Sequence, residues 1–267
     1  MRKCRIIVII NQKGGVGKTV TTFNLAVGMA MKGLRVLVID MDPQGHLTVA
    51  MGWRNKDDLT MTITQHLERA IADNLVDPMD GILNHDEGID LMPANRKLSD
   101  TEVKLMNALY REAKLKMYLD TVIATGTYDC ILIDSPASLS VLTTNALTAA
   151  DSVIIPTQTE FLSANGIADT MGIINAVRRQ LNPSLTVSGI LLTMVNKRTN
   201  LSRETEKSLR QAYDGIAKIY DAYIPRANSL ADCTTCGMSI YEWDHKSVAA
   251  KAYGAFVNEV LADEAQG

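Results

Sequence analysis

The sequence predicts an α/β protein: a single doubly wound, mostly parallel sheet flanked by helices. Short apolar runs alternate with longer amphipathic segments along the chain, which is the order of a β-α-β-α fold. Several apolar runs are nearly continuous in Val, Ile and Leu, as expected of strands buried on both faces. The length of 267 residues and the hydrophobic content of 46% suit one domain spanning 1–267.

Six runs are expected strands because they are rich in β-branched and apolar residues and end at polar or glycine-containing segments. In chain order they are Arg5–Ile10, Arg35–Ile39, Ile89–Met92, Tyr128–Ile133, Ser152–Pro156 and Thr186–Met194. Helical spacing of apolar residues between and after them predicts helices over Lys18–Met31, Thr62–Ala70, Leu98–Ala124, Val141–Ala149, Asn165–Leu181, Leu201–Ala212 and Lys246–Ala262. Residues 52–98 are the least regular, and we interpret them as an insertion carrying one or two short helices.

Composition and charge bear on three classes of function: nucleic-acid binding, secretion and membrane insertion. The net charge of −3 excludes a general polycation, so nucleic-acid binding would need a local patch. Residues 178–226 hold nine Lys or Arg against four Asp or Glu, which makes this the candidate region. The apolar run Ile6–Ile10 is too short for a secretory signal, and no run of 18 apolar residues occurs. We therefore expect a cytoplasmic protein that does not span a membrane.

Of the four cysteines, Cys4 and Cys130 fall in or beside apolar runs and are expected to be buried reduced thiols. Cys233 and Cys236 have the spacing of a metal or redox pair. A structural zinc needs four ligands, so this pair would need further ligands, for example across a dimer. Ordinary thiols are the alternative, and the sequence leaves the choice open.

A glycine-rich segment follows the first strand and opens the first helix, the context that a phosphate-binding loop requires. Its glycines let backbone N–H groups surround phosphate oxygens at the positive end of a helix. We expect Lys18 to reach the β- and γ-phosphates of ATP and the Thr19 hydroxyl to bind Mg²⁺. The predicted nucleotide-binding residues of this loop are Gly14, Gly15, Val16, Gly17, Lys18, Thr19 and Val20.

Carboxylates follow two further strands. Asp40 and Asp42 end the second strand, where residues two apart share a face, and Asp134 ends the fourth. Beside a triphosphate such groups bind Mg²⁺ through water or orient an attacking water. We therefore expect Asp40 and Asp134 to support the metal together with Thr19. Ligands of doubly wound sheets bind at the carboxyl ends of strands, where these segments should meet.

The segment from Lys13 to Thr19 resembles the deviant phosphate loop of the superfamily of ParA, MinD and the nitrogenase iron protein. Gln12 stands where the ordinary loop has a glycine, and Lys13 is the additional lysine of the deviant loop. The resemblance implies that Lys13 reaches across a nucleotide sandwich dimer to the ATP of the partner subunit. It also implies that Asp42, within Asp-Met-Asp-Pro-Gln, aligns the hydrolytic water, so that Lys13, Lys18 and Asp42 are the expected catalytic residues.

The resemblance extends over about residues 3–262, and its later segments favour the short, Soj-like type of ParA protein. Ala137 departs from the family pattern, which often has a second proline there, and Asn165 replaces a common glutamate. An Asn at a strand end can pair with the adenine edge through its amide, which makes Asn196 a candidate base contact, although a structural turn role is the alternative. In the family the segment that includes Pro225 and Arg226 lines the base and ribose.

Four functions share this type of site: DNA partition, membrane positioning as in MinD, electron transfer as in the nitrogenase iron protein, and amide synthesis as in cobyrinic acid synthases. The acidic end of the chain, Asn258–Gly267, disfavours a lipid-binding amphipathic helix. No cysteine lies between Asp134 and Cys233 to hold a bridging cluster, and the length leaves little room for a glutaminase domain. We therefore favour partition, with a MinD-like ATPase acting on a membrane or protein surface as the alternative.

A partition protein needs a positive surface for nonspecific DNA. Basic residues that could form it are Arg178, Arg179, Lys197, Arg198, Arg203, Lys207, Arg210 and Lys218, of which Arg178, Arg179, Arg203, Lys207 and Arg210 are the predicted DNA contacts. A solvated helix face is the alternative for each. The resemblance implies an ATP-bound homodimer on the nucleoid and a centromere-binding, ParB-like partner that stimulates hydrolysis. The chain itself offers no room for an operator-reading helix-turn-helix before its first strand.

Overall fold

The computed structural model describes residues 4–74, 76–160, 163–197 and 199–266. An eight-stranded sheet has the strand order β3-β4-β2-β5-β1-β6-β7-β8. The strands are β1 (Arg5–Ile9), β2 (Val36–Asp40), β3 (Leu83–His85), β4 (Ile89–Met92), β5 (Cys130–Asp134), β6 (Ser152–Gln158), β7 (Thr186–Val195) and β8 (Ile219–Pro225). Every pairing is parallel except β3 with β4, which confirms the predicted doubly wound fold.

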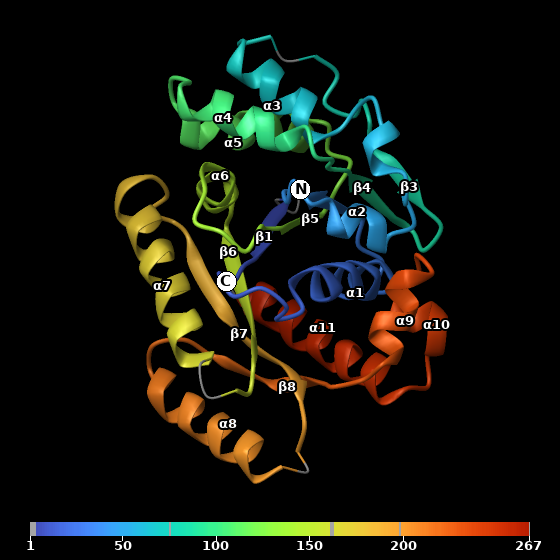
Figure 1. Ribbon diagram of the computed structural model, residues 1–267, viewed down its shortest axis with the longest axis vertical. Coiled ribbons are helices and arrows are strands. Elements are labelled where there is room, and N and C mark those ends of the chain that lie inside the picture. Colours follow the sequence, from blue (N-terminus) through green and yellow to red (C-terminus); the bar gives the residue numbers. More distant parts are fainter. Residues whose placement is uncertain (1–3, 75, 161–162, 198, 267) are drawn as a thin grey trace.

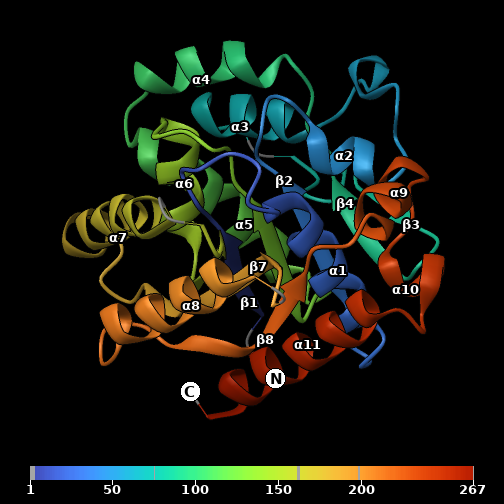
Figure 2. The ribbon, with the colours of Figure 1, turned by 60° about the horizontal axis from the view of Figure 1, so that its bottom comes forward.

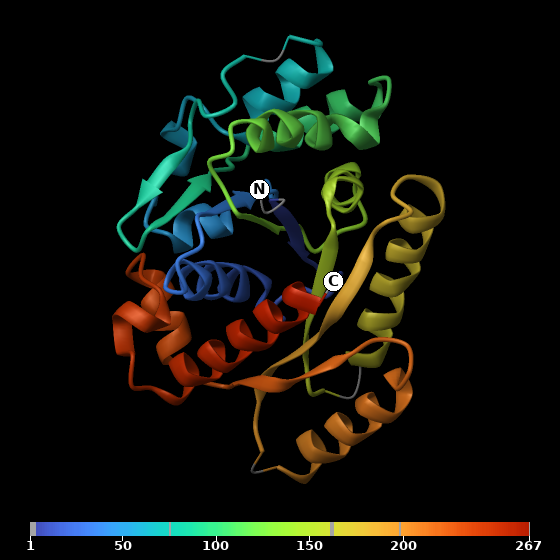
Figure 3. The same ribbon diagram turned by 180° about the vertical axis from the view of Figure 1, so that it is seen from behind.

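Helices cover both faces of the sheet (Figures 1 and 3). They are α1 (Lys18–Ala30), α2 (His46–Ala50), η1 (Lys56–Asp58), α3 (Ile63–Ile71), α4 (Leu98–Met106), η2 (Arg111–Ala113), α5 (Lys114–Ala124), α6 (Val141–Ala149), α7 (Ser163–Gln180), α8 (Asn200–Tyr213), α9 (Ser229–Thr235), α10 (Ile240–Asp244) and α11 (Val248–Gln266). Here η marks a single turn of 3₁₀ helix.

Alternation along the strands divides the interior into two cores. On β1, Ile6 and Val8 pack with helices α3 to α7, whereas Ile7 and Ile9 pack with α1, α2 and α9 to α11. All four side chains are at most 5% exposed, because successive residues of a strand point to opposite faces and both faces are covered. This double burial explains why the strands read as continuous apolar runs.

The predicted helix Leu98–Ala124 is wrong as one continuous helix. Asn107 caps the end of α4, and Tyr110 has a left-handed backbone with φ of 51° before a new start at η2. The buried Asn145 of α6 stabilises this break. Its Nδ2 donates to the carbonyl oxygen of Arg111 at 2.7 Å, and its Oδ1 accepts from the backbone N–H of Leu115 at 3.0 Å. A tertiary contact therefore overrides a helical period that runs through the segment.

Other elements differ from the sequence prediction in extent. The region 52–98 contains η1, α3 and the hairpin β3–β4, and β4 lies beside β2, with Leu37 opposite Asp90. The strands β3 and β8 and the short helices α2, α9 and α10 were not expected from periodicity. Strands β1 and β8 come from opposite ends of the chain and share one sheet.

Candidate nucleotide-binding site

The three loops that the sequence singled out meet at the carboxyl edge of the sheet. Strand pairing aligns Ile9 with Asp134 and Asp40 with Asp134, so β1, β5 and β2 end side by side. A cavity of about 830 Å³ opens there. Its lining comes from the loops after β1, β2 and β5, from α4 and from the end of β7, and includes Gly14, Gly15, Gly17, Lys18, Thr19, Val20, Asp42, Ser135, Glu102 and Met194.

The glycine-rich loop forms an open cradle at the start of α1. Gly15 and Gly17 have φ of 73° and 85°, the left-handed region that favours glycine. A Cβ at Gly14 or Gly15 would meet no atom within 4 Å, so the loop faces open space. No side chain caps the first turn of α1, and no acidic residue lies in it. The loop and the helix dipole therefore fit an anion of the size of a phosphate group.

Lys18 lies against this cradle as a nearly buried cation. Its side chain belongs to a residue that is 8% exposed, and Nζ donates to the carbonyl oxygen of Lys13 at 3.3 Å. Burial lowers the pKa of Lys18, and the charges of Asp134 and Asp42 oppose that shift. An ammonium group has three donors. A phosphate oxygen in the cradle would accept a hydrogen bond from the Lys18 ammonium group and offset the hydration that the group loses on burial.

Thr19 and Asp134 form the part of the site that fits a magnesium ion. The Thr19 hydroxyl donates to Asp134 Oδ2 at 2.7 Å, which leaves the lone pairs of the hydroxyl oxygen for a metal. Burial, followed by the charge of Asp40, raises the pKa of Asp134 to about 8. Among the described residues no group of three or more His, Cys, Asp and Glu could hold a metal. Mg²⁺ suits such a sparse site, because it keeps waters and takes phosphate oxygens as ligands.

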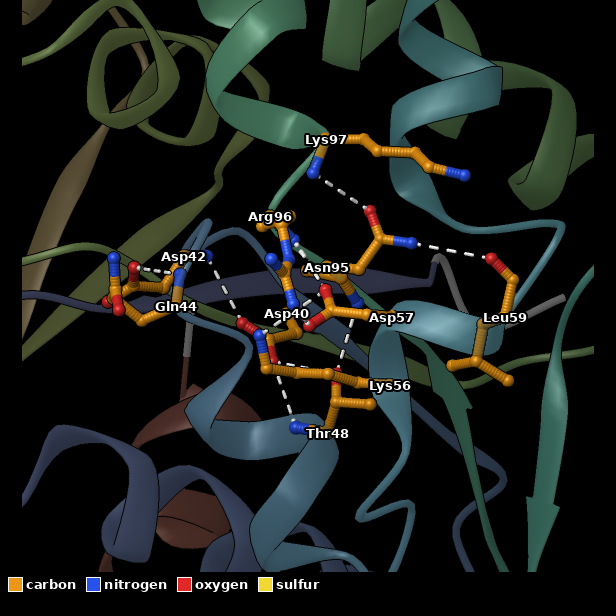
Figure 4. Close-up of polar contacts among 11 residues, drawn as sticks. Asp40, Asp42, Gln44, Thr48, Lys56, Asp57, Leu59, Asn95, Arg96 and Lys97 are labelled. Carbon is orange, nitrogen blue, oxygen red and sulfur yellow. Dashed lines mark hydrogen bonds and ion pairs between the residues drawn. The ribbon is translucent and has the colours of Figure 1, made fainter.

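Asp40 is fully buried and organises the loop that carries Asp42 (Figure 4). Asp40 Oδ2 accepts from the backbone N–H and the hydroxyl of Thr48, both at 2.8 Å, and Oδ1 accepts from the N–H of Asp42 at 3.1 Å. Burial raises the pKa of Asp40 to about 6, against these hydrogen bonds. The contacts give Asp40 a positioning role beneath the site, and its expected support of the metal through water stays a prediction.

Asp42 lines the cavity itself. Its Oδ1 accepts from the backbone N–H of Gln44 at 2.9 Å, which orients the carboxylate at the turn after β2. Gly45, at the end of that turn, has φ of 59°, and a Cβ there would lie 2.9 Å from the carbonyl oxygen of Ala94. The turn therefore requires glycine, and it places the carboxylate of Asp42 in the wall of the cavity.

Lys13 contacts its own chain in this structure. Asn11 Oδ1 accepts from the backbone N–H of Lys13 at 2.9 Å, and Asn11 Nδ2 donates to the carbonyl oxygen of Pro156 at 2.8 Å. Lys13 Nζ lies 2.8 Å from Glu160 Oε2. Both charged side chains are partly exposed, at 32% and 61%, so water screens the pair and weakens it. The lysine is thus held near the cavity by a contact that can open.

The predicted base contacts line a separate cavity of about 760 Å³. Asn196, Pro225 and Arg226 all contribute to its wall, because β7 and β8 end together, with Val195 opposite Pro225. The Arg226 N–H donates to the Val195 carbonyl at 3.2 Å. The structure therefore brings these three residues together in the wall of one cavity, and their contact with the base stays a prediction.

Met194 lines the candidate site, although no sequence motif pointed to it. It lines the phosphate cavity with φ of 52°, which is unusual for a residue other than glycine inside a strand. Glu102 of α4 and Thr234 of α9 also line that cavity. Neither belongs to a motif, and only the fold brings them to the glycine-rich loop.

The predicted DNA contacts separate into two groups. The exposed hydroxyl of Tyr213, at the end of α8, donates to the carbonyl oxygen of Ala164 in the first turn of α7 at 3.3 Å. Arg178 and Arg179 lie in the last turn of α7, about 20 Å further along at 1.5 Å per residue. Figure 1 shows α8 at one end of α7 only. One continuous patch over both helices is therefore not formed within a single chain.

On α8, Arg203 and Lys207 are exposed and one turn apart. Arg210 instead ties α8 to β8: its guanidinium donates to the carbonyl oxygens of Ile219 at 3.3 Å and Tyr220 at 3.2 Å. Lys197 lies 3.8 Å from the ring centre of Tyr223, and Lys218 pairs with Asp263 at 2.7 Å. Arg198 lies outside the described residues.

The Cys233 and Cys236 pair does not form a metal site among the described residues. Cys233 is fully buried in the core beside α1, with its Sγ 3.4 Å from the carbonyl oxygen of Leu230, whereas Cys236 is exposed at the end of α9. Cys4 and Cys130 are buried free thiols, as expected. Burial raises the pKa of Cys4 and of Cys233 to about 11, which keeps both as unreactive thiols.

Comparison with known proteins decides the family. The family model described as an AAA domain matches residues 4–187. The chromosome partitioning protein ParA of Caulobacter vibrioides is 38% identical over 261 residues, which is 97% of this chain and 95% of that protein. The chain belongs to the ParA family of P-loop ATPases. The sporulation initiation inhibitor protein Soj of Bacillus subtilis is 38% identical over 263 residues, 97% of this chain and 99% of Soj.

Solved structures of ParA-type ATPases share the fold and carry nucleotides. A cobyrinic acid a,c-diamide synthase of Mycobacterium smegmatis with ADP and magnesium superposes with a TM-score of 0.84 at 33% identity, over 99% of this chain and 96% of that one. The septum site-determining protein MinD of Pyrococcus horikoshii with Mg-ADP has a TM-score of 0.75 at 25% identity, over 97% of each chain. The ligands of these relatives agree with the expected cofactors, ATP and Mg²⁺.

Two further findings bear on the alternatives. A chain with the synthase name is covered to 96% by this one, so length does not separate partition from amide synthesis. Within the described residues, no helix is long and apolar enough to cross a bilayer.

Proposed function

We propose that this ParA-family protein is an ATP-hydrolysing DNA partition protein. In this proposal the ATP-bound chain forms a sandwich dimer, the dimer binds nonspecific DNA, and a centromere-binding, ParB-like partner stimulates hydrolysis and releases it. The observation that carries the proposal is the cavity itself. The phosphate cradle and the carboxylate of Asp42 line this cavity, and the additional Lys13 lies in the same loop, partly exposed and paired with Glu160.

The residues divide the work of hydrolysis among themselves. The cradle from Gly14 to Thr19 would hold the phosphates, with Lys18 as the charge partner of the transferred group. Mg²⁺, when bound, would neutralise charge between the phosphates, held by Thr19 and through water by Asp134. Asp42 would orient the attacking water, and Asp40 would keep the loop of Asp42 in place through its three hydrogen bonds.

Dimerisation is supported by the surface around the cavity mouth. Large apolar side chains are exposed on α4 and on the segments beside it: Val103 (61%), Met106 (58%), Leu109 (82%), Tyr110 (82%) and Leu139 (65%). The same helix supplies Glu102 to the cavity, and Leu139 lies in the loop after β5. A cluster of apolar residues beside a nucleotide site fits a surface that a second subunit covers. Lys13 could then leave Glu160 and reach the partner's phosphates.

Nonspecific DNA would bind to α8, which presents Arg203 and Lys207 to solvent. One subunit offers few phosphate contacts, so its affinity would be low. Two α8 helices held in a dimer act together on one duplex, which links ATP-driven dimerisation to DNA affinity. Arg178 and Arg179 would extend this surface only if a neighbouring subunit or a bent duplex spans the length of α7.

The MinD-like alternative is less well supported. The apolar face of α11, with Tyr253, Phe256, Val257 and Val260, is at most 1% exposed and packs against α1 and β8. It is not available to lie in a lipid surface. A cobyrinic acid synthase shares the fold, and the full-length relatives at 38% identity favour partition over amide synthesis.

The proposal is tested by measuring binding to a nonspecific duplex with ATP and with ADP, at about 50 mM and about 200 mM salt. We expect binding with ATP only, weakened strongly by salt. The double variant Arg203→Ala with Lys207→Ala should lose most of this binding while it keeps ATP affinity. Lys116→Ala on α5 is the matched control, since it removes an exposed cation elsewhere. An ATP-bound dimer that does not bind DNA would exclude a partition function.

A further inference from the structure

Three consecutive residues, the last of β6 and the two after it, contact the phosphate loop at two points and the helix α8 between them. Gln158 contacts the phosphate loop, Thr159 contacts the first turn of α8, and Glu160 contacts the dimerisation lysine. None belongs to a motif that sequence analysis identified. The backbone therefore joins the contacts to the phosphate loop directly to the contact with α8.

Gln158 holds the phosphate loop from the side. Its Nε2 donates to the carbonyl oxygen of Gly15 at 2.8 Å and lies 3.0 Å from the sulfur of Met194. The neighbouring Thr193 donates its hydroxyl to the carbonyl oxygen of Val16 at 2.8 Å. The ends of β6 and β7 therefore hold two consecutive residues of the loop. The left-handed backbone of Met194 shows that its surroundings impose this arrangement.

Thr159 forms a buried link to α8, whose start lies close to β7 in Figure 2. The hydroxyls of Thr159 and Ser202 lie 2.7 Å apart, and the two residues are only 8% and 5% exposed. Thr199 caps the helix just before this point by accepting from the Ser202 N–H at 3.4 Å. Water cannot easily replace either hydroxyl, so the pair fixes the first turn of α8 to the end of β6.

Glu160 pairs with Lys13 at 2.8 Å. If Lys13 turns to the phosphates of a partner subunit, this ion pair must open. Nucleotide binding would thus affect residues 158–160 through two contacts: the hydrogen bond of Gln158 to Gly15 and the ion pair of Glu160 with Lys13.

We propose that the segment Gln158–Glu160 transmits the nucleotide state to α8, with Thr159 as the positioning residue that carries it through its hydrogen bond to Ser202. The inference rests on the proposed function, because α8 bears Arg203 and Lys207. ATP binding and the departure of Lys13 shift the segment, and the first turn of α8 follows. Linkage requires the reverse as well, so DNA on α8 strengthens ATP binding by the same factor.

The variant Thr159→Val tests the relay, because valine keeps the shape and removes the hydroxyl. We expect its ATP affinity to stay within about twofold of the wild type, since Thr159 does not line the phosphate cavity. The ratio of DNA affinity with ATP to that with ADP should fall by about fivefold or more. Ser202→Ala, which removes the other hydroxyl, should give the same result.

Two variants guard against a merely structural effect. Thr159→Ser keeps the hydroxyl and should keep the wild-type ratio. Ser208→Ala removes an exposed hydroxyl from α8 and should also keep it. A Thr159→Val protein with the wild-type ratio would overturn the relay.

Hydrogen exchange of the amides in 199–206 separates failure of the relay from failure of the proposed function. ATP should slow this exchange in the wild type, relative to ADP, and should not do so in Thr159→Val. A wild type that fails to bind DNA yet shows the ATP effect would refute the partition proposal and support the relay. Exchange in α8 that is identical with ATP and ADP in the wild type would refute the relay.

Discussion

At the scale of single residues, the site separates carboxylates by environment. Asp40 and Asp134 are at most 1% exposed, whereas Asp42 lines the cavity. Burial raises the pKa of both buried acids, to about 6 and about 8. The buried pair is tied by hydrogen bonds to Thr48 and Thr19 and so supports the site, while the acid at the cavity is the one positioned to meet water.

Replacing Asp42 by alanine should abolish turnover without abolishing nucleotide binding. The hydrolysis rate should fall by about 10²-fold or more, because the attacking water loses the group that orients it. ATP affinity should change little, since the cradle and Lys18 remain. Phosphate release and ATP binding measure the two effects. The control Asp86→Ala removes an exposed acid from the β3–β4 turn and should hydrolyse ATP normally; rapid turnover by Asp42→Ala would remove Asp42 from the chemistry.

His66 makes a second residue-scale prediction, on stability. It is 1% exposed, its Nε2 lies 2.8 Å from the carbonyl oxygen of Asp80, and its ring stacks on Tyr118 at 4.2 Å. Burial lowers the pKa of His66, with the Asp80 hydrogen bond opposing the shift and Arg69 adding to it. The folded state thus prefers the neutral ring. The contribution of neutral His66 to the free energy of unfolding is therefore complete above the ordinary histidine pKa of about 6.5, and it is lost as the pH falls below that value.

Urea unfolding of the wild type and of His66→Gln at about pH 7.5 and about pH 5.5 measures this contribution. The difference in free energy of unfolding between the two proteins should be larger at the higher pH. Because all other titrating groups are common to both, they cancel in the difference. A difference that is equal at both pH values, or larger at the lower one, would contradict the assignment.

At the scale of elements, sequence periodicity predicted the strands that are buried on both faces. It failed to predict element boundaries that depend on tertiary contacts. The runs that became β1, β2, β5 and β6 were identified because both faces of the sheet are covered. The break between α4 and α5 was missed because Asn145, distant in sequence, supplies the hydrogen bonds that make the new helix start. The three-residue strand β3 is too short to show a period.

We therefore expect Asn145 to contribute more to the free energy of unfolding than an exposed asparagine does. Its substitution by alanine leaves the Leu115 N–H and the Arg111 carbonyl oxygen without this partner, and we expect a loss of about 3 kcal/mol in the free energy of unfolding. Asn107→Ala, which removes an exposed amide at the end of α4, should cost less than about 1 kcal/mol. Equal losses in chemical denaturation would show that Asn145 does not maintain the break.

At the scale of the whole molecule, motif spacing predicted that the three loops of the candidate site meet, because the carboxyl ends of parallel strands lie at one edge of a sheet. It could not show that Lys13 contacts Glu160, since nothing local relates two residues on different loops. The charge pattern also grouped the basic residues of α7 with those of α8. In the fold, the basic residues of α7 lie in its last turn, whereas α8 contacts its first turn. Sequence shows which face of a helix is charged, and only the fold shows which end of it faces a neighbour.

An ATP-switched dimer that depends on Lys13 should show itself in the molar mass of the protein in solution. Asp42→Ala, which should keep ATP uncleaved, is compared by size exclusion with light scattering to the same variant carrying Lys13→Ala. With ATP, Asp42→Ala should be a dimer and the double variant a monomer that still binds ATP; with ADP both should be monomers. A double variant that dimerises with ATP as fully as Asp42→Ala would show that Lys13 is not needed for the ATP-bound dimer.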